Sequence, residues 1–302
     1  MSDKEVIYEV KDFVATITIN RPKTLNAFTG DTIKEMENLL AQAGRDPKVG
    51  VIVLTGVGER AFCVGGDVNW EKGEGGKSGL QDLEFNFNRQ IAECPKPVIA
   101  RVNGYAIGAG HHIAYFCDFT IAAEHAIFGQ NGPRVGSPAG GYIVSHAANV
   151  LGHKRARELW MLCRRYNAQQ AFDWGLANSV VPMAKLDVEV RKYCDELLSL
   201  SPTCLKIVKR SFYHHMAPIM GRDMNDLIKE VTVGMTVRIR PGERVPLDGI
   251  VSLGQSAIDQ SPVTGESLPV DKSPGDEVFA GTINQAAALE IRVTAPASDS
   301  TL

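Results

Sequence analysis

The chain has 302 residues, of which 44% are hydrophobic and 22% charged, and its formal net charge is −3. These values exclude a disordered chain and argue against nucleic acid or an anionic membrane as a partner. No apolar run reaches the roughly 18 residues that a membrane span requires. The start of the chain lacks the layout of a signal peptide, so we expect a cytoplasmic protein.

Composition also predicts where the chain divides. All seven histidines, all six cysteines and all three tryptophans lie before Val231, and Phe279 is the one aromatic residue after it. The part before Val231 has 27 basic and 26 acidic residues, and the part after it has 5 and 9. We therefore predict two separately built units, residues 1–230 and 231–302. The cysteines are scattered without zinc-type spacing, which indicates reduced thiols and no metal site.

The hydrophobic pattern predicts an α/β protein with partly parallel sheets in the first unit. The chain opens with a predicted hairpin over 6–19, with its turn at Lys11 and Asp12. A helix follows over 31–44, with Asp31 as its N-cap and Gly44 as its end. The pattern further predicts buried strands over 49–56, 97–104 and 119–124, and a glycine-rich mobile loop over 71–79. It predicts helices over 153–163, 168–177, 185–200 and 201–212. Beyond Val231 the pattern changes to short β-rich runs.

Three stretches are informative together because of their order and spacing. They are NRPKTLNAF (20–28), AFCVGGDV (61–68), and VNGYAIGAGHHIAYFCD (102–118) followed by IFGQNGPRVGS (127–137). In this order they resemble the crotonase (enoyl-CoA hydratase/isomerase) superfamily over about residues 5–230. The resemblance implies a ClpP/crotonase-like spiral of ββα units, an acyl-CoA substrate and a homotrimer or hexamer. It implies no permanently bound cofactor, because coenzyme A arrives as part of the substrate.

The resemblance also implies where a thioester enolate would be stabilised. Members of this family direct two backbone N–H groups at the enolate oxygen, helped by the positive end of a helix. The family pattern maps these donors onto Gly66 and Ala109. It further implies a coenzyme A path formed by these residues: Lys23, Thr24, Leu25, Val64, Gly66, Asp67 and Val68. Lys23 could equally be a solvated turn lysine, and Asp67 could cap the loop that carries Gly66.

The acid/base group is where this chain departs from its family. The two glutamates that hydratases use match His112 and Gly132, so simple hydration by two carboxylates is not expected. A histidine is a good general acid/base near neutral pH, and we hypothesise that His112 activates a water molecule. Ser137 and Tyr142 are retained near the site. The alternative interpretation is that His112 packs in the core, Ser137 caps a helix or turn, and Tyr142 is core packing.

The stretch FGQNGPRVGS and the segments after it look most like the ring-handling branch of the superfamily. That branch includes 2-ketocyclohexanecarboxyl-CoA hydrolase, 6-oxocyclohex-1-ene-1-carbonyl-CoA hydrolase and dihydroxynaphthoyl-CoA synthase. The resemblance implies water addition with hydrolytic ring opening of an alicyclic oxo-acyl-CoA. Ala139 replaces an aspartate found in the synthase and in 2-ketocyclohexanecarboxyl-CoA hydrolase, which argues against both of these reactions. The synthase, another hydratase/isomerase-type enzyme and an inactive acyl-CoA-binding fusion stay open as alternatives.

The tail carries the motif Thr264-Gly265-Glu266-Ser267 among β-rich runs. It resembles the actuator domain of heavy-metal (zinc/cadmium-like) P-type ATPases over about residues 231–302. No DKTGT phosphorylation motif and no membrane helix accompany it in this sequence. We therefore expect a small β-rich actuator-like domain without catalysis of its own, and we interpret the whole chain as a chimera.

Overall fold

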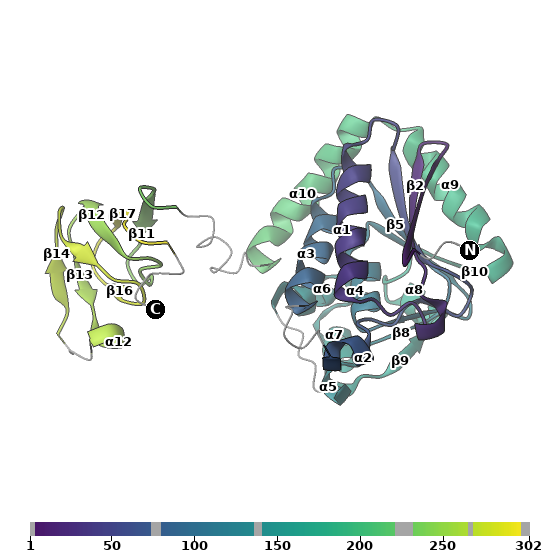
Figure 1. The fold of residues 1–302 in the computed structure, drawn as a ribbon, viewed down its shortest axis with the longest axis horizontal. Helices are drawn as coiled ribbons and strands as arrows, with labels where there is room; N and C mark the ends of the chain where they lie inside the picture. The colour runs from purple at the N-terminus through teal and green to yellow at the C-terminus, as the bar shows by residue number, and fades with distance from the viewer. Residues whose placement is uncertain (1–3, 74–79, 136–140, 221–231, 265–267, 297–302) are drawn as a thin grey trace. The chain divides into compact units, whose positions relative to one another are not determined.

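The computed structural model describes residues 4–73, 80–135, 141–220, 232–264 and 268–296. The chain divides into two compact units, Met1–Met220 and Gly221–Leu302 (Figure 1). The predicted join at residue 230 falls within 221–231, outside the described residues. Among the helices that the structure describes, none is long and apolar enough to cross a membrane.

The first unit is built on a six-stranded sheet in the order β1-β2-β3-β5-β7-β10. Its strands are β1 Val6–Lys11, β2 Val14–Ile19, β3 Val51–Gly56, β5 Val98–Val102, β7 Phe119–Ala123 and β10 Ser179–Val181. Only β1 and β2 pair antiparallel in this sheet. The predicted hairpin and partly parallel sheet are confirmed. The turn lies one residue later than predicted, at Asp12 and Phe13, whose φ angles of 46° and 62° suit a two-residue hairpin turn.

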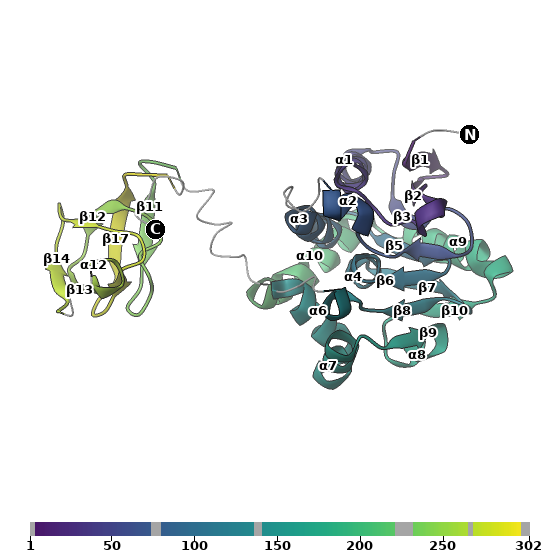
Figure 2. The ribbon, with the colours of Figure 1, turned by 60° about the horizontal axis from the view of Figure 1, so that its bottom comes forward.

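Helices cover both faces of this sheet (Figure 2). On β3, Ile52 and Leu54 point into the main core, which α1 and α3 cover, whereas Val51 and Val53 pack with residues of α9. This two-sided burial explains why residues 51–54 are continuously apolar. The helices are α1 Gly30–Arg45, α2 Val68–Gly73, α3 Leu80–Glu93, α4 Ala109–Phe116, α5 Gly132–Val135, α6 Gly141–Leu151, α7 His153–Leu162, α8 Ala168–Asp173, α9 Leu186–Leu198 and α10 Pro202–Met220, with 3-10 turns η1 Pro22–Thr24 and η3 Met183–Lys185.

Three local predictions differ from the structure. The N-cap of α1 is Thr29, not Asp31, because the side chains of Thr29 and Thr32 cap each other's backbone N–H groups. The helix passes through Gly44 and ends at Arg45. In the predicted loop 71–79, residues 71–73 belong to α2, and 74–79 lie outside the described residues.

A second, four-stranded sheet was not predicted. Its strands are β4 Ala61–Cys63, β6 Tyr105–Ile107, β8 Ile127–Gly129 and β9 Arg165–Asn167, in the order β4-β6-β8-β9. Strands β4, β6 and β8 each follow a strand of the large sheet directly, and a helix comes next in the chain. This repeated ββα arrangement places the ends of β4 and β6 beside the start of α4.

The second unit is β-rich, as predicted. Its elements are β11 Thr236–Ile239, β12 Gly249–Leu253, β13 Ser256–Asp259, α12 Ser261–Thr264, β14 Val270–Lys272, β15 Glu277–Val278, β16 Ile283–Asn284 and β17 Leu289–Val293. They form two antiparallel sheets, ordered β11-β17-β12-β15 and β14-β13-β16. Ile239, Val251, Ile258 and Leu289 are among the residues of its own small core.

Candidate active site

The structure brings the two predicted oxyanion segments together. Phe28 N donates to Gly65 O and Asp67 N donates to Phe28 O, both at 2.9 Å, so residues 65–67 run beside Phe28. Gly65 has φ +96°, and a Cβ there would lie 3.3 Å from the backbone N of Ala109. Gly65 is therefore required by its own left-handed backbone and by the close approach of Ala109.

The start of α4 is pressed against the end of β4. A Cβ on Gly110 would lie 2.0 Å from Cys63 O, so only glycine allows this contact. Ala109 is the first residue of α4, where backbone N–H groups have no partner within the helix. Within the described residues, neither Gly66 N–H nor Ala109 N–H donates to a protein acceptor. Both groups can therefore donate to a ligand, and their role as an oxyanion hole stays a prediction.

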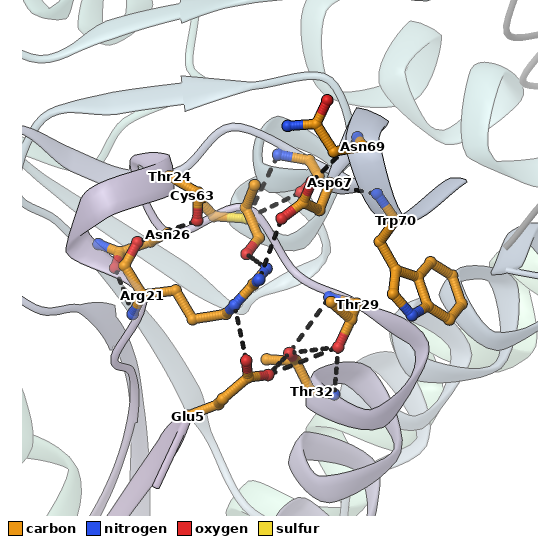
Figure 3. A network of polar contacts seen from close by, with 12 residues as sticks. Glu5, Arg21, Thr24, Asn26, Thr29, Thr32, Cys63, Asp67, Asn69 and Trp70 are labelled. Carbon is orange, nitrogen blue, oxygen red and sulfur yellow. Dashed lines mark hydrogen bonds and ion pairs between the residues drawn. The ribbon is translucent and has the colours of Figure 1, made fainter. Parts of the chain in front are cut away.

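A group of polar side chains holds this loop in place (Figure 3). We call it the Arg21 cluster: Glu5, Arg21, Thr29, Thr32 and Asp67. The Arg21 guanidinium lies between two carboxylates, with Nε 3.0 Å from Glu5 Oε1 and Nη2 3.0 Å from Asp67 Oδ2. Thr32 Oγ1 donates to Glu5 Oε2 at 2.5 Å, which joins the cap of α1 to the same group.

Asp67 is part of this support. Its Oδ1 accepts from the backbone N–H groups of Asn69 and Trp70, at 3.1 and 3.4 Å, so it caps α2. Its residue is only 8% exposed. The carboxylate that was predicted to line the coenzyme A path is thus occupied by Arg21 and the helix start. Sequence reasoning missed Arg21, because its partner Asp67 lies 46 residues further along the chain.

The other predicted coenzyme A residues lie on two segments, 20–28 and 61–68, which pair through the backbones of Phe28 and Gly66. Lys23 is exposed on η1, and Thr24 Oγ1 donates to Arg21 O at 3.2 Å. Leu25 is half-buried in a left-handed conformation, with φ 54°. Val64 is half-buried and Val68 is 51% exposed. The structure places these residues near one another in the fold, and their contact with coenzyme A stays a prediction.

His112 lies one turn into α4 from Ala109 and is only 3% exposed. Its Nε2 is 3.1 Å from Gln130 Oε1, and Gln130 Nε2 is 3.4 Å from His111 Nδ1. An amide oxygen only accepts hydrogen bonds, so His112 Nε2 donates to Gln130 Oε1. The Trp160 ring stacks on His112, with 5.1 Å between ring centroids. Sequence reasoning named neither Gln130 nor Trp160 as site residues.

His112 also begins a row of rings, which we call the aromatic wall. Its members are Trp160, His112, Tyr115, His146, Phe116 and Tyr142, and the distances between successive ring centroids are 5.1, 5.7, 5.8, 4.4 and 5.6 Å. The predicted residues His112 and Tyr142 therefore belong to one continuous row of packed rings that begins on α7 and runs across α4 to α6. Ser137 and Ala139 lie outside the described residues, and Gly132 is the first residue of α5.

Burial keeps two of the site histidines neutral. It lowers the pKa of His111 from 6.5 to about 3, with smaller contributions from His112 and Arg165. It lowers the pKa of His146 from 6.5 to about 4. The ring Nε2–H of His146 donates to Tyr115 O at 3.1 Å, because a carbonyl only accepts, and this leaves its lone pair on Nδ1.

Comparison with known proteins shows what each unit is similar to. Residues 9–226 match the enoyl-CoA hydratase/isomerase family. Solved structures similar to the chain include an enoyl-CoA hydratase from Mycobacterium avium subsp. paratuberculosis K-10, with 30% identity, a TM-score of 0.66 and coverage of 76% of this chain and 92% of that one. An enoyl-CoA hydratase/isomerase from Xanthobacter autotrophicus Py2 has 29% identity, a TM-score of 0.65 and coverage of 71% and 81%. An enoyl-CoA hydratase from Bacillus anthracis has 28% identity, a TM-score of 0.65 and coverage of 70% and 83%.

The second unit gives a separate match. Residues 221–302 match the P-type ATPase actuator domain. Within the Thr264–Ser267 motif, Thr264 ends α12 and the other three residues lie outside the described part of the chain.

Proposed function

The chain belongs to the enoyl-CoA hydratase/isomerase family, and from this premise we propose that its first unit binds an acyl-CoA thioester and stabilises the enolate formed from it. The observation that supports the proposal is the close approach of Gly65 to the Ala109 backbone nitrogen, on the segment that continues into Gly66. Two such donors, fixed before the reaction, stabilise a developing negative oxygen without reorganisation.

His112 is the acid/base group in this proposal. It lies on the helix whose first N–H is one of the two donors, and Gln130 together with Trp160 fixes its ring. In this proposal, Nδ1 of His112 is the nitrogen that takes the proton. The two-glutamate chemistry of hydratases is unavailable because His112 and Gly132 occupy the matching positions.

The finer proposal is hydrolytic ring opening of an alicyclic oxo-acyl-CoA. His112 Nδ1 takes a proton from water, and the water oxygen bonds to the ring ketone carbon. The bond from that carbon to the thioester α-carbon then breaks, and its electron pair forms the enolate held by Gly66 and Ala109. His112 returns the proton to the α-carbon, so a saturated ring consumes one water and opens to an acyl-CoA that carries a carboxylic acid. In 6-oxocyclohex-1-ene-1-carbonyl-CoA the α-carbon belongs to a C=C bond, so a first water adds across that bond, its hydroxyl to the β-carbon and its proton to the α-carbon, before a second water opens the ring. The likeness of FGQNGPRVGS to the ring-handling branch supports this choice.

The test is incubation with 6-oxocyclohex-1-ene-1-carbonyl-CoA in ¹⁸O-water, with crotonyl-CoA alongside and products followed by mass spectrometry. We expect a labelled ring-opened acid from the cyclic thioester and little product from crotonyl-CoA. Replacing His112 with glutamine keeps a hydrogen-bonding group but removes the base, and we expect turnover to fall about 100-fold or more. Unchanged turnover in His112→Gln would exclude His112 as the base.

A second candidate is an acyl-CoA-binding protein without turnover. It is favoured by the boundary between the two family matches. The enoyl-CoA hydratase/isomerase match ends at residue 226, and the match to the actuator domain of P-type ATPases begins at residue 221. Saturable acyl-CoA binding with no product from either thioester would support this alternative.

For the second unit we propose an actuator-like β-domain without ATP hydrolysis, joined to the first unit as a chimera. Its support is the match over residues 221–302 and the absence of a DKTGT motif from the sequence. Phosphate release from ATP by the full chain would contradict it. We also propose that the protein is cytoplasmic and forms a homotrimer or hexamer. Light scattering after size-exclusion chromatography tests the number of subunits directly.

A further inference from the structure

Buried polar atoms without a protein partner gather around α4. They are both side-chain atoms of Asn88, Nε2 of His111, Nδ1 of His146 and Nε1 of Trp160. Asn88 is on α3 and His146 on α6, and both helices pack against α4. Trp160 stacks on His112. Native proteins pair most buried polar atoms with protein groups or with water, so these atoms are available to hydrogen-bonding atoms of water or of a ligand.

The chemistry of these atoms limits what can pair with them. His146 donates from Nε2 to Tyr115 O, so its unpaired Nδ1 is an acceptor. Asn88 offers a donor and an acceptor, and its side chain is fully buried. A purely hydrocarbon acyl group would leave these atoms unsatisfied. An acyl group with a hydroxyl or carbonyl oxygen would satisfy at least one of them.

These atoms also lie beside the proposed chemistry. His146 is a member of the aromatic wall that starts at Trp160 and His112, and its ring is 5.8 Å from that of Tyr115. The acyl chain of a thioester held by Gly66 and Ala109 would extend along α4, where α3 and α6 meet that helix. The unpaired atoms are therefore on the elements that would enclose the acyl group.

We propose that Asn88 and His146 bind an oxygen substituent on the acyl group, so that the natural substrate is an oxo- or hydroxy-acyl thioester. This inference rests on the proposed function, since it requires that the first unit binds acyl-CoA. It goes further by naming two specificity-determining residues. It also names the substrate feature that they recognise.

Two coenzyme A thioethers test it, cyclohexylmethyl-CoA and (2-hydroxycyclohexyl)methyl-CoA. Neither has a thioester carbonyl, so neither can be turned over, and calorimetry gives a Kd for each. We expect the full-length protein to bind the hydroxyl compound about tenfold more tightly, as one hydrogen bond to a buried partner would give. In Asn88→Leu this preference should fall to about one, with the Kd of the plain thioether within about threefold of its original value.

Gln90→Leu is the matched control. Gln90 is on the same helix and also has a buried unpaired oxygen, but it lines a hollow between α1 and α3 with Leu40, Gly44 and Cys94. We expect it to keep the preference. If Asn88→Leu does not fold, as judged by tryptophan fluorescence, His146→Phe provides the same comparison.

A preference near one in the unaltered protein, or a preference that survives both Asn88→Leu and His146→Phe, would overturn the inference and leave the proposed function intact. Failure to bind both thioethers and the cyclic thioester would instead overturn the proposed function. Ring opening is measured separately, so the two failures remain distinguishable.

Discussion

Two polar regions of the first unit differ in how their hydrogen bonds are completed. In the Arg21 cluster, the named side chains pair with one another or with the backbone: Arg21 with Glu5 and Asp67, and Asp67 with the start of α2. Beside α4, polar atoms of His146 and Asn88 are buried without a protein partner. A satisfied network fixes the backbone, whereas an unsatisfied one is available to a ligand. The first should therefore control stability and the second should control binding and turnover.

The largest expected effect comes from Gly110, where the start of α4 meets the end of β4. In Gly110→Ala the new Cβ would meet Cys63 O, which forces the start of α4 away from β4. Because the Ala109 donor moves with it, we expect turnover to fall about 100- to 1000-fold. Gly44→Ala in α1 is the control, since a Cβ there would make ordinary van der Waals contacts with Pro95 and Cys94, and it should leave turnover unchanged.

The second effect breaks the satisfied network. Arg21→Met leaves Asp67 buried without its cation, and we expect the free energy of unfolding to fall by about 3 kcal/mol. Urea unfolding followed by tryptophan fluorescence measures this, because all three tryptophans lie in the first unit. Arg191→Met is the control: Arg191 is 44% exposed and pairs with Asp195, and its loss should change stability by about 0.5 kcal/mol or less. Equal effects of the two substitutions would contradict the comparison.

The third effect is a pH dependence that belongs to the region beside α4. The folded-state pKa values of His111 and His146 are lowered to about 3 and about 4, so the unfolded chain binds more protons below its own value of 6.5. Stability is full above pH 6.5 and falls as pH decreases toward pH 4, by about 1.4 kcal/mol per pH unit for each histidine. The free energy of unfolding, measured from pH 7 to pH 4.5, should decrease less steeply in His146→Phe than in the unaltered protein. An identical slope would show that His146 is not buried in its neutral form.

The smallest effect concerns Leu25, which holds a left-handed backbone with φ 54°. Asparagine tolerates this conformation better than leucine does. We expect Leu25→Asn to raise the free energy of unfolding by roughly 0.5 kcal/mol. If Leu25 also contacts coenzyme A, the Kd for free coenzyme A should increase in the same variant. Weaker stability together with unchanged binding would argue against both statements.

Much of the first unit could be predicted because its signals are local. The apolar run over 51–54 is buried on both faces, and the hairpin alternates along β1 and β2. The second sheet could not be predicted, because strands of three residues such as Ala61–Cys63 are too short to show a period. The end of α1 was misplaced because Gly44 faces Pro95 and Cys94 within the fold, which no local rule reveals.

The candidate site divides in the same way. Gly66, Ala109 and His112 could be predicted as site residues because their motifs are contiguous in the sequence. Arg21, Gln130 and Trp160 depend on partners that are 18 to 48 residues away, such as Gln130 for His112 and Asp67 for Arg21. Asn88 carries no local signal, since only its complete burial without a partner makes it notable.

The central claim, that the first unit stabilises a thioester enolate with His112 as the acid/base group, is tested most directly by hydrogen exchange. Heptanedioyl-CoA, the product expected from ring opening of a 2-oxocyclohexane thioester, is incubated in deuterium oxide, and mass spectrometry follows deuterium entering its α-carbon. We predict exchange by the unaltered protein and a decrease of about 100-fold or more in His112→Gln. Exchange at an equal rate in the variant would contradict the role of His112, and no exchange in the unaltered protein would contradict enolate formation itself.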